Sequence, residues 1–302
     1  MDAAISQVRR FNRIVTQRVG ALNDHFLSRD RSLGEARLLW EIGPDGRDVR
    51  SLRAQLELDS GYVSRLLRSL EAAGLITVGP DESDRRLRIA RLTKLGLAER
   101  KVLDRRSNEL AASLLAPLGP GQRARLVAAM ADVERLLTAA MVDISPVDPS
   151  HPDARYCLRE YFSELDRRFD TGFDPARSIS ALDDEMRSPA GLFLVATLHG
   201  DPIGSGALKF HGKRPAELKR MWVAKSARGL GVGRRLLTEL ENQAARHGVR
   251  TLRLETNKTL VEAISLYRSA GYVEVAAFND EPYAHHWFAK HIGSARKPGS
   301  RR

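Results

Sequence analysis

Residues 217–235 read E-L-K-R-M-W-V-A-K-S-A-R-G-L-G-V-G-R-R, and they join a strand-like run to a helix through a glycine-rich loop. The first seven residues alternate between polar and apolar side chains, which predicts a strand over residues 217–223. Leu236 and Leu240 lie on one side of the helix that follows the loop. A strand, a glycine loop and a helix in this order are typical of a binding site for an anionic group.

The loop R-G-L-G-V-G, residues 228–233, has the physical properties that such a site needs. Its glycines let the backbone approach a ligand closely, and the first amides of the helix point at an anion with the help of the helix dipole. Arg228 and Arg234 add positive charge that suits a pyrophosphate. No G-K-[ST] follows, which excludes a P-loop, and the spacing misses the G-x-G-x-x-G dinucleotide motif by one residue. A glycine-rich helix start without a ligand remains the alternative.

More strands and helices are predicted on both sides of this loop. Residues 192–198 and 202–210 predict a hairpin of two strands. Beyond the helix of the loop, the pattern predicts a strand at 251–255, a helix at 259–269, and strands at 272–275 and 284–290.

Three motifs in this half resemble the GNAT superfamily of acetyltransferases. They are the R-x-x-G-x-G loop after E-L-K-R-M-W-V, the run N-K-T-L-V-E-A-I-S-L-Y-R-S-A-G-Y (257–272), and the final strand H-W-F-A-K (286–290). The resemblance covers about residues 142–292. It implies an α/β (α+β) fold whose mixed sheet splays between its fourth and fifth strands, with acetyl-CoA as co-substrate in the gap.

The resemblance also implies which residues hold the co-substrate. The backbone of Met221, Trp222 and Val223 would hold the pantetheine arm, and the side chain of Asn257 would form a hydrogen bond to it. A backbone N–H of the fourth strand would stabilise negative charge on the acetyl carbonyl. Amides of the loop would hold the pyrophosphate, from Arg228, Gly229, Leu230, Gly231, Val232, Gly233 and Arg234.

Acetyl transfer to an amine needs two groups that handle protons. Glu217 opens the fourth strand and is predicted to face the gap as a general base, directly or through a water. Tyr267 stands at the position that the family uses to protonate the departing thiolate, and a phenol of ordinary pKa, about 10, is a usable donor. The alternatives are core packing for Tyr267, and an ion pair with Lys219 or Arg220 for Glu217.

Aromatic and polar residues outside the loop are predicted to form the pocket for a small amphipathic amine. The candidates are Tyr161, Phe169, Phe173, Asn279, Tyr283, His285 and His286. Adjacent histidines on a strand point to opposite faces, so no metal site is expected there. Cys157 has no neighbour in sequence that would lower its thiol pKa, and it is expected to be a buried small residue of a helix rather than a nucleophile.

The first half of the chain predicts a helix-turn-helix. Residues 49–56 and about 60–73 form two short helices around the turn E-L-D (57–59). The second helix has an apolar side and a polar side. Strand-like runs at 75–78 and 87–92 then flank a turn-rich connection that ends in two arginines. Such a unit can place Arg and Ser in the major groove and a hairpin tip in the minor groove, although any amphipathic helix pair shares part of the pattern.

The run L-D-S-G-Y-V-S-R-L-L-R-S-L-E-A-A-G-L-I (58–76), the D-x-R of Asp84 and Arg86, and L-T-K-L-G (92–96) resemble the MarR family of winged-helix regulators. The resemblance implies a homodimer built from the outer helices, about residues 5–22 and 95–140. It implies double-stranded DNA with an inverted repeat as partner. The DNA contacts would come from Ser60, Ser64, Arg65, Arg68 and Arg86.

The length of 302 residues suggests two domains, and 49 Lys+Arg against 38 Asp+Glu give a net charge of +11 that suits an anionic partner. We expect a winged-helix domain at 1–141, an acetyltransferase domain at 142–292 and a disordered basic tail at 293–302. The proline-rich run 142–152 is the predicted linker. Residues 1–10 have no apolar core of a secretory signal, and no apolar run is long enough for a membrane span, so a cytoplasmic protein is expected.

Three functions fit these patterns. The first is an acetyl-CoA-dependent N-acetyltransferase for a small amine or amino-acid-like acceptor, fused to a DNA-binding regulator. The second is a regulator whose second half senses acetyl-CoA or an amine without turnover. In the third, the winged helix is only a dimer scaffold for the enzyme.

Overall fold

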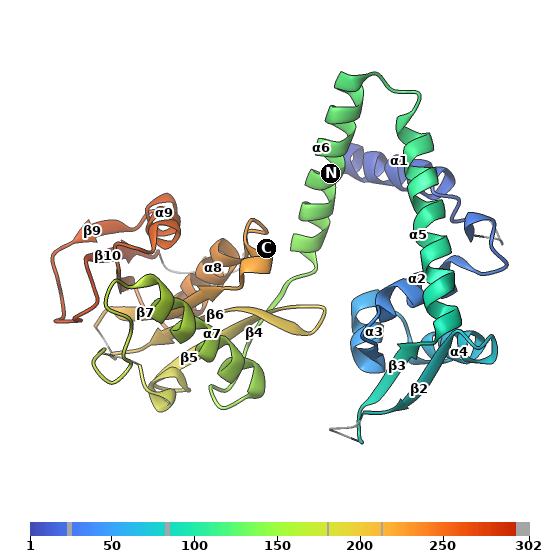
Figure 1. The fold of residues 1–302 in the computed structure, drawn as a ribbon. Coiled ribbons are helices and arrows are strands. Elements are labelled where there is room, and N and C mark those ends of the chain that lie inside the picture. Colours follow the sequence, from blue (N-terminus) through green and yellow to red (C-terminus); the bar gives the residue numbers. More distant parts are fainter. Residues whose placement is uncertain (23–25, 82–84, 180, 213, 294–302) are drawn as a thin grey trace, which may run out of the picture. The chain divides into compact units, whose positions relative to one another are not determined.

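The computed structural model describes residues 1–22, 26–81, 85–179, 181–212 and 214–293. The chain divides into two compact units, Met1–Met130 and Ala131–Arg302 (Figure 1). This division lies inside one helix, α6 (Pro120–Ala140), about ten residues before the boundary expected from the proline-rich run. The expected tail beyond Gly293 and the motif residue Asp84 lie outside the described residues.

The first unit is mainly helical. Its helices are α1 (Asp2–Arg18), the short turn η1 (Phe26–Ser28), α2 (Leu33–Ile42), α3 (Val49–Leu56), α4 (Ser60–Ala72), α5 (Lys94–Leu115) and the start of α6. Strands β1 (Arg47–Asp48), β2 (Ile76–Pro80) and β3 (Arg88–Leu92) form an antiparallel sheet in the order β1-β3-β2. The predicted helix pair and hairpin are therefore present.

Side-chain caps fix where α3 and α4 begin. The carboxylate of Asp48 accepts the Ser51 N–H at 2.9 Å, and that of Asp59 accepts the Tyr62 N–H at 2.9 Å. Between the helices, Glu57 adopts a left-handed conformation with φ 52°, which ends α3 and turns the chain. The apolar side of α4 packs with α2 and α3 in one core that includes Leu38, Leu52 and Leu70.

The second unit is a seven-stranded sheet with helices on its faces. Its elements are β4 (Asp143–Pro146), α7 (Pro152–Arg168), η2 (Asp183–Met186), β5 (Gly191–Leu198), β6 (Asp201–Lys209), β7 (Ala216–Val223), η3 (Lys225–Ala227), α8 (Val232–Arg246), β8 (Thr251–Thr256), α9 (Val261–Ser269), β9 (Val273–Val275) and β10 (His286–His291). The strand order is β4-β5-β6-β7-β8-β10-β9.

Alternate side chains of the central strands reach the two faces of this sheet. Phe193 and Ala207 pack with α7 residues, whereas Leu194 and Leu208 pack with the leucines of α8. Both faces are thus covered, which explains why β5 and β6 read as nearly continuous apolar runs.

Strands β7 and β8 are the parallel pair, and they separate almost at once. Only Ala216↔Leu252 and Glu217↔Arg253 are paired, although both strands continue further. On the other side, the register of β7 with β6 shifts, so that Arg220 and Met221 together stand opposite Gly206. The predicted splay between the fourth and fifth strands of the acetyltransferase fold lies at this pair.

The predicted linker 142–152 is wrong in part. Asp143–Pro146 is the edge strand β4, which pairs antiparallel with β5. Pro146 ends that strand. An edge strand tolerates proline, which has no backbone N–H, at a residue whose N–H would face away from the sheet. Arg235 of α8 donates to the carbonyl of Val142 at 2.7 Å and to that of Ala139, so the segment is held against the second unit.

The helices predicted to form a dimer carry exposed apolar side chains. No residue of α1 or α6 is buried. Helix α1 exposes Ile5, Val8, Phe11, Ile14 and Val15. None of the helices in the described part of the chain is long and apolar enough to cross a membrane.

Candidate active site

A cavity of about 520 Å³, here the loop cavity, lies between the end of β7 and the start of α8. Its walls include Met221, Trp222, Val223, Arg228, Gly229, Gly231, Val232, Gly233 and Arg234. These are the residues that the sequence assigned to a co-substrate, with two exceptions. Asn257 lines a different cavity, described below. Leu230 does not line the cavity, and its side chain packs against the core of the second unit.

The backbone at the start of α8 forms an open cradle. Gly229 and Gly231 have φ of 85° and 75°, and a Cβ built on either meets no atom within 4 Å. Arg235 is the first residue whose N–H donates back along the helix, to the Gly231 carbonyl at 3.1 Å. The amides of residues 232–234 therefore have no partner within the helix, and with the helix dipole they fit a pyrophosphate.

The two arginines of the loop already have partners. The Arg228 guanidinium donates to both carboxylate oxygens of Glu164, at 2.6 and 2.8 Å. Glu164 also accepts the Trp222 indole N–H at 3.2 Å. Arg234 donates to the Ser269 hydroxyl. These contacts hold two cations at the mouth of the cradle.

A second cavity of about 90 Å³, here the inner cavity, adjoins the loop cavity. The side chains of Tyr161, Met221 and Tyr267 line both. Tyr267 is 5% exposed, and burial raises the pKa of its hydroxyl well above the ordinary value, so the hydroxyl keeps its proton. Burial likewise raises the pKa of Tyr161. Tyr267 is therefore packed in the core and also borders both cavities, so the two interpretations considered from the sequence do not exclude each other.

Some predicted acceptor residues line the inner cavity and others do not. Tyr161, Phe169, Phe173 and Tyr283 line it, and the last three form a cluster of rings with centroids 4.9 to 5.7 Å apart. Asn257 also lines it, but its amide donates to the Tyr283 carbonyl at 2.8 Å and its Oδ1 accepts the Thr259 N–H at 2.9 Å. Asn257 therefore braces the cavity wall.

Asn279 and the two histidines line neither cavity. Asn279 accepts the Trp287 indole N–H at 2.8 Å through Oδ1. The His286 Nδ1 lies 2.6 Å from Glu274, at the β9–β10 edge of the sheet. Neighbouring strand residues alternate between faces, and the sequence alone did not tell which face belongs to the cavity.

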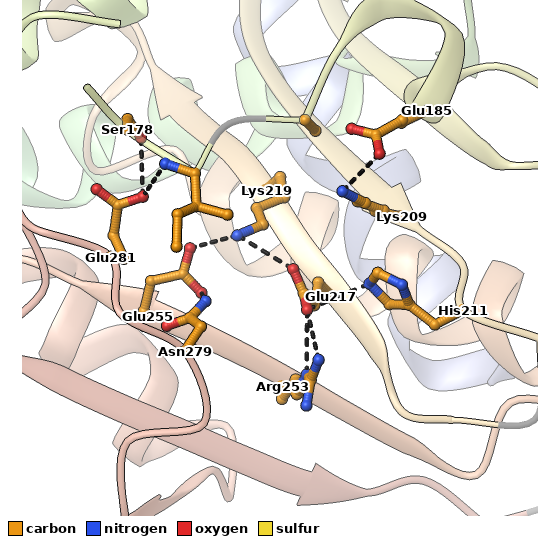
Figure 2. A network of polar contacts seen from close by, with 12 residues as sticks. Ser178, Glu185, Lys209, His211, Glu217, Lys219, Arg253, Glu255, Asn279 and Glu281 are labelled. Carbon is orange, nitrogen blue, oxygen red and sulfur yellow. Dashed lines mark hydrogen bonds and ion pairs between the residues drawn. The ribbon is translucent and has the colours of Figure 1, made fainter. Parts of the chain in front are cut away.

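A network of charged side chains extends beside the inner cavity, from β7 to β8 (Figure 2). Lys219 contacts Glu255 and lies 3.2 Å from Glu217, and Arg253 donates to Glu217 at 2.6 Å. His211 lies 3.2 Å from the same carboxylate. Glu217 and Lys219 are two residues apart in β7, as Arg253 and Glu255 are in β8. These four side chains therefore emerge on the same face of the sheet.

Glu217 does not line either cavity. Burial would raise the pKa of its carboxyl, but Lys219 and Arg253 outweigh burial and lower the pKa below the ordinary value. A carboxylate held by these cations is a weak base. The alternative considered from the sequence, an ion pair with Lys219, is present, whereas Arg220 is not its partner.

The sequence missed the charged residues that line the inner cavity: Lys219, Arg220, Glu255 and Glu281. Glu281 accepts hydrogen bonds from the Ser178 hydroxyl, at 2.9 Å, and the Ile179 N–H, at 2.7 Å, so it joins two loops. The alternation R-L-E in β8 could have indicated Glu255. Nothing local could have indicated Glu281, because its partners are about a hundred residues away.

Cys157 is buried, as expected. Its Sγ lies 3.6 Å from the Gly204 carbonyl, and burial raises the pKa of the thiol to about 12. It is therefore no nucleophile at neutral pH. No group of three or more His, Cys, Asp or Glu side chains suited to a metal ion occurs among the described residues.

The outward side of α4 in the first unit carries the residues predicted to touch DNA. Ser60, Ser64, Arg65 and Arg68 are exposed, and so is Arg86 in the connection between β2 and β3. The Arg65 guanidinium lies 5.6 Å from the centre of the Tyr62 ring.

Comparisons with known proteins match both units. The acetyltransferase (GNAT) family matches residues 158–272, and the MarR family matches residues 30–87. An IAA acetyltransferase of Azospirillum brasilense is 36% identical over 126 residues, which are 41% of this chain and 80% of that protein. An uncharacterized N-acetyltransferase of Schizosaccharomyces pombe is 31% identical over 142 residues, 44% of this chain and 79% of that protein.

Among solved structures, a GNAT-family acetyltransferase from Staphylococcus aureus is 16% identical with a TM-score of 0.43, over 50% of this chain and 99% of the other. The assignment rests on the two relatives, whose matches span most of each relative, and on the family match over residues 158–272, which includes the loop and the Tyr267 helix. The chain therefore belongs to the GNAT family as an N-acetyltransferase, and it carries a MarR-family winged-helix domain in its first half.

Proposed function

We propose that the protein transfers an acetyl group from acetyl-CoA to a small amine or amino-acid-like acceptor. The observation that carries this proposal is the meeting of the two cavities at Tyr267 and Met221. The loop cavity has a cradle of free amides for a pyrophosphate, and the inner cavity, at about 90 Å³, is much smaller than the loop cavity at about 520 Å³. An acceptor group that enters the inner cavity is therefore small.

Acetyl-CoA supplies the acetyl group as a thioester. Tyr267 is the proton donor to the departing sulfur, since its hydroxyl stays protonated when buried. A backbone N–H of β7, at the bulge formed by Arg220 and Met221, stabilises the negative charge on the carbonyl oxygen.

Glu255 is our candidate for the base, in place of Glu217, because its side chain lines the inner cavity and it contacts one cation, Lys219, whereas Glu217 contacts both Lys219 and Arg253. It takes a proton from the ammonium of the acceptor and passes it to solvent. When the nitrogen bonds the acetyl carbon it loses one further proton, and Tyr267 gives one to the sulfur as the carbon–sulfur bond breaks. The proton from nitrogen then restores Tyr267, so that charge and atoms balance.

The test is a thiol-release assay with acetyl-CoA over a panel of amines and amino acids. We expect release above background with at least one acceptor, and loss of that release in Glu255→Gln while coenzyme affinity is unchanged. Coenzyme binding without turnover of any acceptor would contradict the enzymatic proposal. It would favour the sensor, in which acetyl-CoA alters DNA affinity without reaction.

The first unit is proposed to bind double-stranded DNA as a homodimer. The exposed Ser and Arg side chains of α4 support this, because such groups bind phosphates and base edges. A gel shift with DNA from upstream of the protein's own gene tests it. We expect a shift that weakens with salt and that Arg65→Ala and Arg68→Ala reduce, whereas Arg246→Ala on α8 of the second unit leaves it unchanged. The absence of any salt-sensitive shift would contradict DNA binding and favour the winged helix as a dimer scaffold for the enzyme.

A further inference from the structure

Arg220 is a buried cation whose charge has no carboxylate partner among the described residues. Its exposed fraction is 8%, and its Nε has no hydrogen-bond partner. One terminal nitrogen donates to the Ala181 carbonyl at 3.2 Å. The guanidinium also lies over the Phe162 and Tyr161 rings, 4.7 and 5.6 Å from their centres. Rings and one carbonyl compensate only part of the cost of burying a charge.

Three other cations around the two cavities have carboxylate partners, whereas Arg220 has none that the structure describes. Lys219 has Glu217 and Glu255, Arg253 has Glu217, and Arg228 has Glu164.

The acidic side chains that border Arg220 on its outer side form ion pairs with other arginines. Arg155 pairs with Asp183, and Arg187 pairs with Asp184 at 2.5 Å. The protein thus has carboxylates nearby and none of them neutralises Arg220.

The backbone holds Arg220 in an unusual conformation. Its φ is 57°, which is rare for a residue other than glycine, and it lies in the bulge opposite Gly206. The Ser205 hydroxyl donates to its carbonyl at 3.1 Å. Backbone strain of this kind persists where the surrounding structure enforces it, and it is concentrated at functional sites.

Arg220 lines the inner cavity together with Glu255 and Tyr267, and it also borders two outer pockets beside Ala181, but it does not line the loop cavity. The phosphates of a coenzyme in the glycine cradle are therefore not its counterion. We propose that the acceptor carries a carboxylate close to its amine, as an amino acid does, and that Arg220 binds this carboxylate while the amine faces Glu255 and Tyr267. This inference rests on the proposed acetyl transfer, and it makes Arg220 the residue that sets acceptor specificity.

The experiment compares amino acids with their own carboxamides and decarboxylated amines in the thiol-release assay. With the wild-type protein, we expect kcat/KM to favour the carboxylate form by roughly 10- to 100-fold, as for a charge-assisted pair. Arg220→Gln should abolish that preference by lowering kcat/KM for the amino acid alone. Arg220→Lys should retain part of it, because the charge stays but the two-pronged geometry is lost.

Arg246→Gln is the matched control, since Arg246 lies near the end of α8, borders neither cavity and is 60% exposed in its side chain. It should leave the preference unchanged. Equal use of amino acid and carboxamide by the wild-type protein would overturn the inference and leave the acetyltransferase proposal intact, even if the Arg220 variants do not fold. An equal loss for all acceptors in Arg220→Gln would also overturn it, because that result describes a structural role. Failure of every acceptor would instead reject the proposed function.

Discussion

Tyr267 borders both cavities and is almost completely buried, which places a protonated hydroxyl between the cavities proposed for the thioester and for the acceptor. We predict that Tyr267→Phe lowers kcat by about 100-fold, a usual contribution of one proton donor, with little change in the KM for acetyl-CoA. Steady-state thiol release measures both constants.

Tyr272→Phe is the control for this change. Tyr272 is a buried neighbour whose ring centre is 5.9 Å from that of Tyr267, yet it lines neither cavity. It should keep kcat within about twofold. A comparable fall in both variants would show that the phenol matters for packing rather than for proton transfer.

Cys157 leads to a second prediction, because it is the single cysteine of the chain. Its burial and raised pKa mean that the native thiol should react with a chromogenic disulfide only after unfolding. The measurement counts reactive thiols with and without denaturant. One thiol titrating at once in the native protein would contradict the burial, whereas a silent thiol also keeps the thiol-release assay free of background.

The start of α8 depends on glycine at residue 231. The backbone there is left-handed, and a Cβ would project into the open cradle. Gly231→Ala should lower the free energy of unfolding by about 1 kcal/mol through backbone strain and also weaken coenzyme binding. Urea unfolding and calorimetric titration with CoA measure the two effects.

Gly248→Ala provides the matched comparison at the other end of the same helix. Gly248 has φ 76° and equally open surroundings, but it is far along the chain from the cradle and lines neither cavity. The strain should be similar and the CoA affinity unchanged. If both variants lose affinity alike, the cradle is not where the coenzyme binds.

Strands β7 and β8 carry a charge network whose stability depends on pH. The folded pKa of Glu217 lies below its ordinary 4.5, so its contribution is complete above that value and is lost as the pH falls. Burial would lower the pKa of Lys219, but Glu255 and Glu217 outweigh it and raise that pKa, so its contribution is lost only in strong alkali.

We therefore predict that the free energy of unfolding falls between about pH 5 and about pH 3, and that Glu217→Gln reduces this fall. At neutral pH the variant should be less stable by about 3 kcal/mol, since it leaves Lys219 and Arg253 with fewer counterions. Urea titrations at both pH values test this. A variant with an unchanged pH dependence would exclude Glu217 as its source.

Motifs with local physical causes were predictable from the sequence. The glycine loop, the Tyr267 helix and the helix pair with its Asp59 cap all follow from spacing and backbone chemistry within about fifteen residues. Glu217 was expected in the gap because strand alternation could not tell which face is open. Arg220 and Glu281 escaped notice, since one depends on a bulge and the other on loops from distant parts of the chain.

The chain as a whole carries an unpaired apolar stripe on α1, and no α1 residue is buried. A homodimer would cover that stripe, because exposed apolar surface of this extent is typical of an interface. We predict that Val8→Glu together with Phe11→Glu yields a monomer in sedimentation equilibrium. Gln17→Glu, on the opposite side of α1, should remain dimeric, and a wild-type monomer would reject the dimer altogether.

The bulge at Arg220 and Met221 has a consequence for chain length. Lys219 and Trp222 are three residues apart yet share one face of the sheet, because the additional residue reverses the alternation beyond it. Deleting a single codon here would turn Trp222 into the α8 core and Val223 out of it. The number of residues between Lys219 and Trp222 therefore matters more to the fold than the identity of most residues in the strand. Insertions or deletions in this segment should be far less tolerated than substitutions.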